Sequence, residues 1–477
     1  MNETNTPALP DDRPDEGNPA KIMDGRERDD RPLRDRSLVY SLRDGMAWSV
    51  MIGFGDNYVG PFALFLSATT IQMGWLASLP PFIGAVSQIV AAHLTERIRI
   101  RRPIIVWSAA IQALMWMMLF AVPVLMPRSL AIPALIAIVI LITTGGHFTV
   151  PAWMSLMGDL VPPDTRGTYF ARRNRICQFL TMLSIVLAGW ILQTFKSEGS
   201  ARVPYGFLTI FAVACIGRLV SARYLFLQYE PPYAPPTRQD GGFLEHLRSL
   251  RGTDFGRFSQ FMALMNFAVS LSGPFFVVYL LRDLGLTYLQ FTIVTGMVVL
   301  SQILTLVFWG TAADRFGNKW ALMTCGSVLA LAPIALTCST HVVFLAVFQF
   351  VISSVGAGFN LAAANYVFES LGPNRITRHV AYYHVTNATG VLFGGLFGGW
   401  LATHVPAHLA LGALGVTFAS SVVTVYLISA AFRVALVLYF RSRIQELRTV
   451  SPVPNARALV RMAVQQSDIS RWLSPHR

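Results

Sequence analysis

Twelve runs of about 20 apolar residues, almost free of charge, dominate this sequence. That length is what a helix needs to cross the hydrocarbon core of a bilayer. Within lipid a segment must satisfy its own backbone hydrogen bonds, and the runs do not alternate apolar with polar residues as barrel strands do. The sequence therefore predicts an all-α integral membrane protein. We expect spans at 43–66, 72–94, 103–126, 130–158, 169–194, 205–228, 257–281, 288–311, 320–339, 342–368, 379–403 and 408–432.

The charge content supports this interpretation. Only 13% of the 477 residues are charged, against about 25% in soluble domains. The net charge of +13 would fit a nucleic-acid partner, but the arginines occupy short loops between apolar runs, so we expect none. The four cysteines lie inside apolar runs without metal-type spacing, and neither a metal nor a cofactor is expected.

The loops on one side of the predicted membrane hold most of the cations. They include Arg97, Arg99, Arg101, Arg102, Arg166, Arg172, Arg173, Arg175, Arg238, Arg248, Arg251, Arg257, Arg315, Lys319, Arg375 and Arg378, whereas the other side has Arg128, Lys196, Arg202 and Arg282. By the positive-inside rule the first set is cytoplasmic. Both tails are then inside the cell, and we expect the protein to lie in the inner membrane. Residues 1–37 are polar, without the apolar core of a signal peptide. We expect a disordered N-tail over 1–42 and a cytoplasmic C-tail over 433–477.

The two halves of the chain resemble each other. Gly60-Pro61-Phe62 recurs 213 residues later, Ser87-Gln88-Ile89 recurs 214 later, and Gly189-Trp190 recurs 210 later. Three ordered matches at nearly one offset indicate a duplicated unit of six spans. We expect six-helix bundles at 43–228 and 257–432, joined by a cytoplasmic linker at 229–256 with a short amphipathic helix from Phe243 to Leu250. Such halves share one orientation, with the substrate site between them.

The loop after the eighth apolar run carries a recognisable sequence motif. It reads Gly310-Thr-Ala-Ala-Asp314-Arg315-Phe316-Gly317-Asn318-Lys319, which resembles the signature loop G-x-x-x-D-R-x-G-x-K/R of the major facilitator superfamily. The first-half copy, around Glu96 and Arg97, is degenerate. The resemblance covers about residues 40–435 and implies a secondary transporter of twelve helices in two pseudo-symmetric bundles, expected as a monomer. The segment Trp153 to Arg175 also looks like a bacterial branch of the family.

The resemblance implies a gate built around this loop. Asp314 can meet the positive end of a neighbouring helix, and Gly310 and Gly317 allow a tight turn and close approach. We expect Glu369, at the end of span 10, to pair with Arg315 or Lys319. By the repeat, Asp159 should meet an arginine of the 97–102 group. Plain positive-inside anchoring would explain the cations but not the aspartate and glycines.

Asp56 is the only carboxylate near the middle of a span. A charged aspartate there costs about 3 kcal/mol unless it is paired or hydrated, so we expect it to bind and release a proton during transport; the alternative is a structural aspartate. His147 in span 4 is the second candidate, because histidine titrates near neutral pH, although a lone histidine is commonly structural. We expect Asp44 at the interface and Arg218 to extend toward the membrane surface.

Other polar side chains in the spans are candidates for the substrate cavity. They are Asn57, Tyr58, Arg172, Arg175, Asn266, Asn360, Asn365, Tyr383, His384 and Asn387. Arg172 and Arg175 would attract an anion, or else extend toward lipid headgroups. The glycine series of span 11, from Gly390 to Gly399, indicates close helix packing.

These features favour a proton-coupled secondary transporter of a small organic anion or polar metabolite. Span 4 lacks the arginine of many proton-coupled relatives, and span 5 lacks the Gly-Pro pattern of drug antiporters. A drug/proton antiporter therefore remains an alternative, as does a non-transporting nutrient sensor. The chain has only three lysines, none after a glycine, so it holds no Walker loop of an ATP-driven pump. No catalytic pair indicates an enzyme.

Overall fold

The computed structural model describes residues 19–162, 165–232, 252–370, 376–405, 409–411, 416–418 and 421–448. The first half contains α1 (Pro19–Met51), η1 (Ile52–Asp56), α2 (Asn57–Phe65), α3 (Thr70–Ile98), α4 (Arg102–Leu125), α5 (Arg128–Leu160), α6 (Arg166–Ser197), η2 (Ser200–Arg202) and α7 (Val203–Phe226). The second contains α9 (Asp254–Ser272), α10 (Phe275–Val278), η3 (Tyr279–Asp283), α11 (Tyr288–Phe316), α12 (Asn318–Leu336), α13 (Val342–Ser370), α14 (Ile376–His404), β1 (Leu409–Leu411), β2 (Val416–Phe418) and α15 (Ser421–Arg441).

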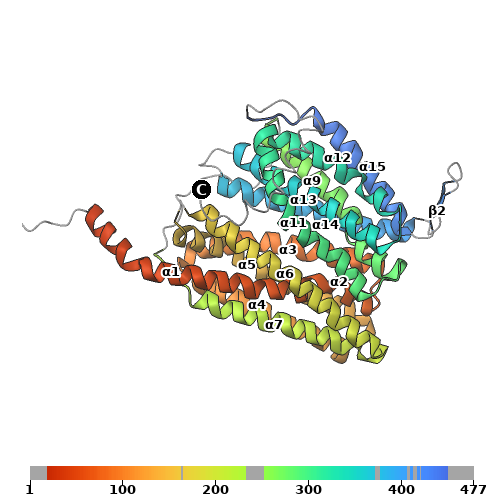
Figure 1. Ribbon diagram of the computed structural model, residues 1–477, viewed down its shortest axis with the longest axis horizontal. Helices are drawn as coiled ribbons and strands as arrows, with labels where there is room; N and C mark the ends of the chain where they lie inside the picture. The colour runs from red at the N-terminus through yellow and green to blue at the C-terminus, as the bar shows by residue number, and fades with distance from the viewer. Residues whose placement is uncertain are drawn as a thin grey trace, which may run out of the picture.

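The helices form twelve rods, because α1, η1 and α2 run on as one and α9, α10 and η3 as another. Ten candidate spans among the described residues are long and apolar enough to cross a membrane. Figure 1 shows α1 to α7 in one layer and α9 to α15 in the other. The prediction of an all-helical membrane protein in two six-helix halves is confirmed. We call the end of the bundle that carries Arg101, Arg166 and Arg315 the arginine-rich end, and the end that carries Lys196 and Arg282 the opposite end.

The first rod is interrupted near the middle of its predicted span, residues 43–66. Residues Ile52–Asp56 form one π-helical turn, a distortion that often marks functional positions. The Asn57 amide nitrogen donates to the Ile52 carbonyl oxygen over 3.1 Å, and so satisfies a backbone group that the distorted turn presents. This places Asp56 at the last residue of a local irregularity in mid-span.

Two seams join the halves, and they are related by the repeat. In the first seam Gly74 of α3 lies against Gly395 and Gly399 of α14; in the second, Gly189 of α6 lies against Thr292 of α11. Gly189 and Gly399 are the glycines of the two Gly-Trp pairs, 210 residues apart. The repeated glycines therefore stand at equivalent places, where each half approaches the other.

The Ser-Gln-Ile match fits the structure less well. Thr69 and Gln72 form the capping box that starts α3, and Thr287 and Gln290 form the one that starts α11. These boxes are 218 residues apart, and Glu96 and Asp314 share that offset. Since the tripeptides are 214 apart, they lie one helical turn out of register.

The glycine series of α14 packs as expected. A Cβ at Gly390, Gly394 or Gly398 would meet backbone carbonyls of α9, and one at Gly395 would meet Ser78 and Gly74 of α3. One helix therefore uses two glycine faces, one against its own half and one against the other. Small residues allow the helix backbones to approach closely, because no long side chain stands between them.

The last span was placed wrongly. We expected it at 408–432, but β1 and β2 form an antiparallel strand pair and the helix runs from Ser421 to Arg441. The predicted span stops at residue 432, just before Arg433, and a charge inside a span is costly. Arg433 is only 6% exposed. Its guanidinium donates to the carbonyls of Ala268, Val269 and Leu329 and to the Ser272 hydroxyl, so the helix continues past it.

The N-terminal boundary also differs. Residues 1–42 were expected to be disordered, but α1 begins at Pro19. Ser37 and Ser41 are buried there, and the Ser37 hydroxyl accepts a bond from the Tyr229 amide. Packing against the segment after α7 thus stabilises a helix that composition alone disfavours. The predicted amphipathic helix at 243–250 lies outside the described residues, as do residues 1–18 and 449–477.

We expect Gly394→Ala to lower the thermal unfolding temperature of the purified protein. The added methyl group would meet the Phe267 carbonyl, and overpacking of this kind costs about 1–3 kcal/mol. Gly356→Ala is the matched control, because nothing lies within 4 Å of a Cβ there and alanine is the better helix former. Equal unfolding temperatures for the two variants would contradict the packing argument.

Candidate functional site

A cavity opens in the second half, between α9, α13 and α14. It has a volume of about 380 Å³ and is lined by Met262, Asn266, Asn360, Ala363, Ala364, Val367, Tyr383, His384 and Asn387. Five of these are polar side chains that the sequence offered as cavity candidates. The Asn266 amide donates to Asn387 over 3.1 Å, and the Tyr383 and His384 rings meet edge to face. The structure therefore brings five polar side chains from three helices into the wall of one cavity.

His147 of α5 brings the first half to the same place. Its Nδ1 lies 3.0 Å from the Gln88 side-chain nitrogen of α3. The absence of a side chain at Gly84 leaves room for the imidazole. His147 also lies near enough to His384 for their charges to interact. Two histidines from opposite halves therefore approach each other at the cavity.

Asp56 is exposed although it lies at mid-span. Residues four apart share one face of a helix, and Gly60, four residues on, lies 3.4 Å from Val277 of the second half. The carboxylate therefore sits on the face of the first rod that is turned toward the other half. Arg218 of α7 is close enough for the two charges to interact.

Asn57 and Tyr58, the two residues after Asp56, do not line the cavity. Asn57 bonds within its own helix. Tyr58 is fully buried, and its hydroxyl donates to the Ile185 carbonyl over 2.6 Å and lies 2.8 Å from the Thr292 hydroxyl across the second seam. Tyr58 is thus a seam residue rather than a cavity residue.

The two arginines proposed for the cavity are exposed at the arginine-rich end of α6. Arg172 shares its helical face with Phe179, Leu183 and Trp190, which are exposed apolar side chains of the kind that face lipid. Extension toward headgroups therefore explains Arg172. Asn365 is also absent from the cavity wall, because its amide donates to the Asn318 side chain over 3.3 Å.

A buried charge network inside the first half was missed. Asp44 is 4% exposed and not interfacial; its carboxylate accepts from the Ser221 hydroxyl at 2.6 Å and lies 3.5 Å from Arg173. Arg218 is 3% exposed and donates to Ser221 over 2.8 Å, so it does not extend to the surface. The Arg173 guanidinium also lies over the Trp153 ring. No spacing signal links these residues, since they come from α1, α5, α6 and α7.

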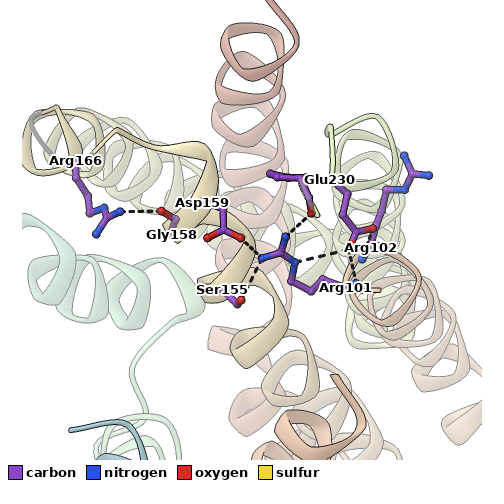
Figure 2. Close-up of polar contacts among 8 residues, drawn as sticks. Arg101, Arg102, Ser155, Gly158, Asp159, Arg166 and Glu230 are labelled. Atoms are coloured by element: carbon purple, nitrogen blue, oxygen red, sulfur yellow. Dashed lines mark hydrogen bonds and ion pairs between the residues drawn. The ribbon is translucent and has the colours of Figure 1, made fainter. Parts of the chain in front are cut away.

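The arginine-rich end of the first half is organised by Arg101, which is fully buried. Figure 2 shows its guanidinium between Asp159, Ser155 and Glu230. The Asp159 carboxylate lies 2.5 Å away and the Ser155 hydroxyl 3.2 Å away. The expected contact of Asp159 with an arginine of the 97–102 group is therefore present. Glu96 and Arg97 are exposed at the end of α3.

In the second half the expected pairing of Glu369 with Arg315 or Lys319 is not present in this structure. Glu369 pairs with Arg448 at 2.5 Å and accepts a bond from Asn318 at 2.7 Å. Arg315 instead lies over the Phe316 ring, and the Lys319 backbone N–H donates to Glu446. The cation comes from the segment after α15, which sequence spacing did not connect to this loop.

The glycines of the signature loop differ in their roles. Gly317 has φ 95° between α11 and α12, a conformation that favours glycine. Gly310 makes only an ordinary contact with Leu361. Asp314 is largely exposed, with Arg448 at 4.0 Å. The tight turn at Gly317 is therefore present, while close approach at Gly310 is not.

Each half also has a glutamate, after its last helix, that caps its third helix. Glu230 accepts from the backbone N–H groups of Arg101 and Arg102 at the start of α4, and Glu446 accepts from Lys319 at the start of α12. A carboxylate at a helix N-terminus satisfies free N–H groups and complements the helix dipole. The duplication thus extends to the ends of the bundle.

We expect Arg101→Met to destabilise the protein by about 3–5 kcal/mol, because it leaves the Glu230 carboxylate, which is only 15% exposed, without its guanidinium partner. Asp159→Asn should cost about 1 kcal/mol, since the Asp159 side chain is 47% exposed and water replaces part of the interaction. Denaturant unfolding of both variants measures the difference, with Arg97→Met as the exposed control. A larger loss for Asp159→Asn than for Arg101→Met would overturn this ranking.

Comparisons with known proteins agree with this arrangement. A family model described as "Major Facilitator Superfamily" matches residues 45–265 and 258–458. Among curated protein sequences, none matches the chain. Solved structures share the fold at low identity. A mutant of the nucleoside transporter NupG is 15% identical, with a TM-score of 0.66, covering 87% of this chain and 100% of that one.

Two further solved structures are similar. A D-xylose-proton symporter is 16% identical, with a TM-score of 0.59, covering 88% of this chain and 99% of that one. An inward-facing, occupied bacterial homolog of the human lysosomal transporter Spinster is 15% identical, with a TM-score of 0.61, covering 88% and 99%. With the family model spanning most of its length and twelve helices in two related halves, this chain belongs to the major facilitator superfamily and is a multi-pass membrane transporter rather than an enzyme.

Proposed function

We propose that the chain moves a small, polar, hydrogen-bonding solute by alternating access, coupled to protons. The observation that carries the proposal is the cavity of α9, α13 and α14, whose wall includes five polar side chains and whose His384 lies within electrostatic reach of His147 of the first half. Its volume lies within the range of small-molecule sites, about 300–1,000 Å³. A site in one half that lies close to a polar side chain of the other suits a transporter whose halves rock around their substrate.

The contacts between the halves support an opening at the arginine-rich end. Among the described residues, the hydrogen bonds that join the halves lie from Gln178 and Gln302 outward to Tyr58, Thr292 and Arg282. These are in the middle of the bundle or toward the opposite end. The positive-inside rule assigns the arginine-rich end to the cytoplasm. The protein then has both tails inside the cell, in the inner membrane, and the present state faces inward.

The lining favours a neutral, hydroxyl-rich solute over an organic anion. Asparagine amides, a phenol and imidazoles both donate and accept hydrogen bonds, and the described wall of the cavity contains neither a carboxylate nor an arginine. The anion argument rested on Arg172, Arg175 and His384, and of these three only His384 lines the cavity. A lipophilic cation would find no carboxylate in this wall. Some relatives by fold are titled transporters of nucleosides and D-xylose, solutes of the kind proposed.

Asp56 is the proposed proton carrier. It faces the other half from mid-span, beside the π-helical turn, where a carboxylate can reach water and also sense a change in packing. A proton removes the cost of moving its charge out of water when the halves close around it. His147, bonded to Gln88, is the second group able to exchange a proton there.

Asp56→Asn should abolish pH-driven accumulation in proteoliposomes while substrate binding remains. Asparagine keeps the shape and polarity but cannot ionise. Asp254→Asn is the control, because that carboxylate belongs to an ion pair with Arg257 on the surface. Accumulation by Asp56→Asn equal to that of the wild type under a pH gradient would exclude the role; an equal loss in the control would point to a general defect.

Binding should discriminate by charge among ligands of one shape. We expect purified protein to bind neutral sugars or nucleosides more tightly than the matching sugar acids or amino sugars, by about tenfold. Asn387→Ala should reduce that binding by about 1–3 kcal/mol, since it also leaves Asn266 without its partner. Arg172→Gln should have no effect. Tightest binding of the acids, lost in Arg172→Gln, would restore the anion hypothesis; tightest binding of the amines would favour a drug antiporter.

A further inference from the structure

Arg218 and Arg433 occupy equivalent places in the two halves. They lie 215 residues apart, on α7 and α15, the last helices of their halves. Both are nearly fully buried, at 3% and 6% exposure. Each packs toward the first helix of its own half, Arg218 through Ser221 to Asp44 and Arg433 directly onto α9. The duplication therefore supplies an internal comparison between two buried guanidinium groups.

Their partners differ. The Arg433 guanidinium is satisfied by backbone carbonyls and the Ser272 hydroxyl, and no described carboxylate contacts it. Arg218 makes one hydrogen bond, to Ser221, and its Nε is buried without a partner. A buried charge is costly unless it is paired or well hydrogen-bonded. Arg433 is thus explained by structure alone, whereas Arg218 needs an opposite charge.

That charge comes from two aspartates on the first rod. Arg218 lies on α7, which packs against both α1 and η1, and this places its charge within electrostatic reach of Asp44 and Asp56. Asp44 is itself shared, because its other oxygen lies 3.5 Å from Arg173. When Asp56 is ionised, two carboxylates balance two arginines. When Asp56 takes a proton, one positive charge is left without balance inside the half.

Other titratable groups near Asp56 act on it less. The helices packed against η1 are α1, α2, α4, α6 and α7. Besides Arg218 and Asp44, their titratable or charged side chains nearest this level are Cys215 on α7, Arg173 and Cys177 on α6, and Tyr58 on α2. Among the described residues, Arg218 is the one whose charge acts on Asp56.

We propose that Arg218 is the positioning residue that supplies the counter-charge of Asp56. Through Ser221 and Asp44 it links the protonation of that carboxylate to Arg173. Arg173 also donates to the Ser41 carbonyl and lies over Trp153, toward the arginine-rich end. A proton bound at mid-membrane thereby changes the electrostatics of the opening. The link rests on the proposed role of Asp56 as the proton carrier.

The test needs no substrate. Infrared spectroscopy of the full-length protein, titrated with pH, follows the C=O stretch of the protonated carboxyl, identified by its loss in Asp56→Asn. Arg218→Met should raise the midpoint pH of this band by about one unit, because removing a nearby positive charge favours the protonated form. Asp44→Asn should lower it, because a negative charge is removed. Arg173→Gln should raise it by less than Arg218→Met.

Arg433→Met is the matched control, since it removes an equally buried arginine that meets no described carboxylate. It should leave the midpoint unchanged even where it lowers thermal stability. Arg218→Lys keeps the charge, so its midpoint pH should stay within a few tenths of a unit of the wild-type value. This variant also provides a test if Arg218→Met fails to fold. Equal midpoints for the wild type and Arg218→Met, or equal shifts for Arg218→Met and Arg433→Met, would overturn the proposal. An unmoved midpoint in Arg173→Gln would remove the link to the opening.

The two proposals fail in different ways. If the midpoints shift as expected but transport does not depend on a pH gradient, Arg218 is the counter-charge of Asp56 and the proton-coupling proposal is wrong. If transport is proton-driven but Arg218→Met leaves the midpoint unchanged, the proton-coupling proposal is supported and the proposed role of Arg218 is wrong.

Discussion

A bilayer offers no water to a buried polar group, and this constraint shapes the whole molecule. Each charged side chain inside the bundle must find its partner within the protein or keep access to a hydrated space. Arg433 donates hydrogen bonds to backbone carbonyl oxygens, and Arg101 pairs with two carboxylates at the end of the bundle. Asp56 instead faces the space between the halves. The few charges in the spans are therefore where structure and function meet.

The seams between the halves follow from the same constraint. In lipid, helices associate through close packing rather than through exclusion of water, so the surfaces that must come together carry small residues. Gly189 and Gly399 hold equivalent places in the two seams, and Tyr58 adds a hydrogen-bonded contact to one of them. Such contacts are short and weakly polar, which suits surfaces that separate when the other side of the membrane is opened.

Much of the site could be predicted because polar residues in apolar runs are rare and therefore visible. Asn266, Asn360 and Asn387 stood out for this reason, and they line one cavity. The predictions failed where proximity depended on chain segments far apart in sequence. Glu369 was assigned to Arg315 or Lys319 of the signature loop, but in this structure Arg448, which follows the last helix, pairs with it. Arg218 was read as a surface residue, because a sequence does not show that Ser221 and Asp44 lie beside it.

The sequence by itself determined the class of fold: hydrophobic length fixes helical spans, and a repeat of six spans together with the signature loop at Asp314 fixes two bundles of like orientation. It also marked Asp56 as exceptional, since no other carboxylate stands at mid-span. Only the tertiary structure decided which charges are paired. Pairing depends on distances of a few ångströms between helices that are adjacent in space but remote in the chain, and hydrophobic periodicity carries no information about that. The partner of Asp56 is therefore a property of the packed bundle.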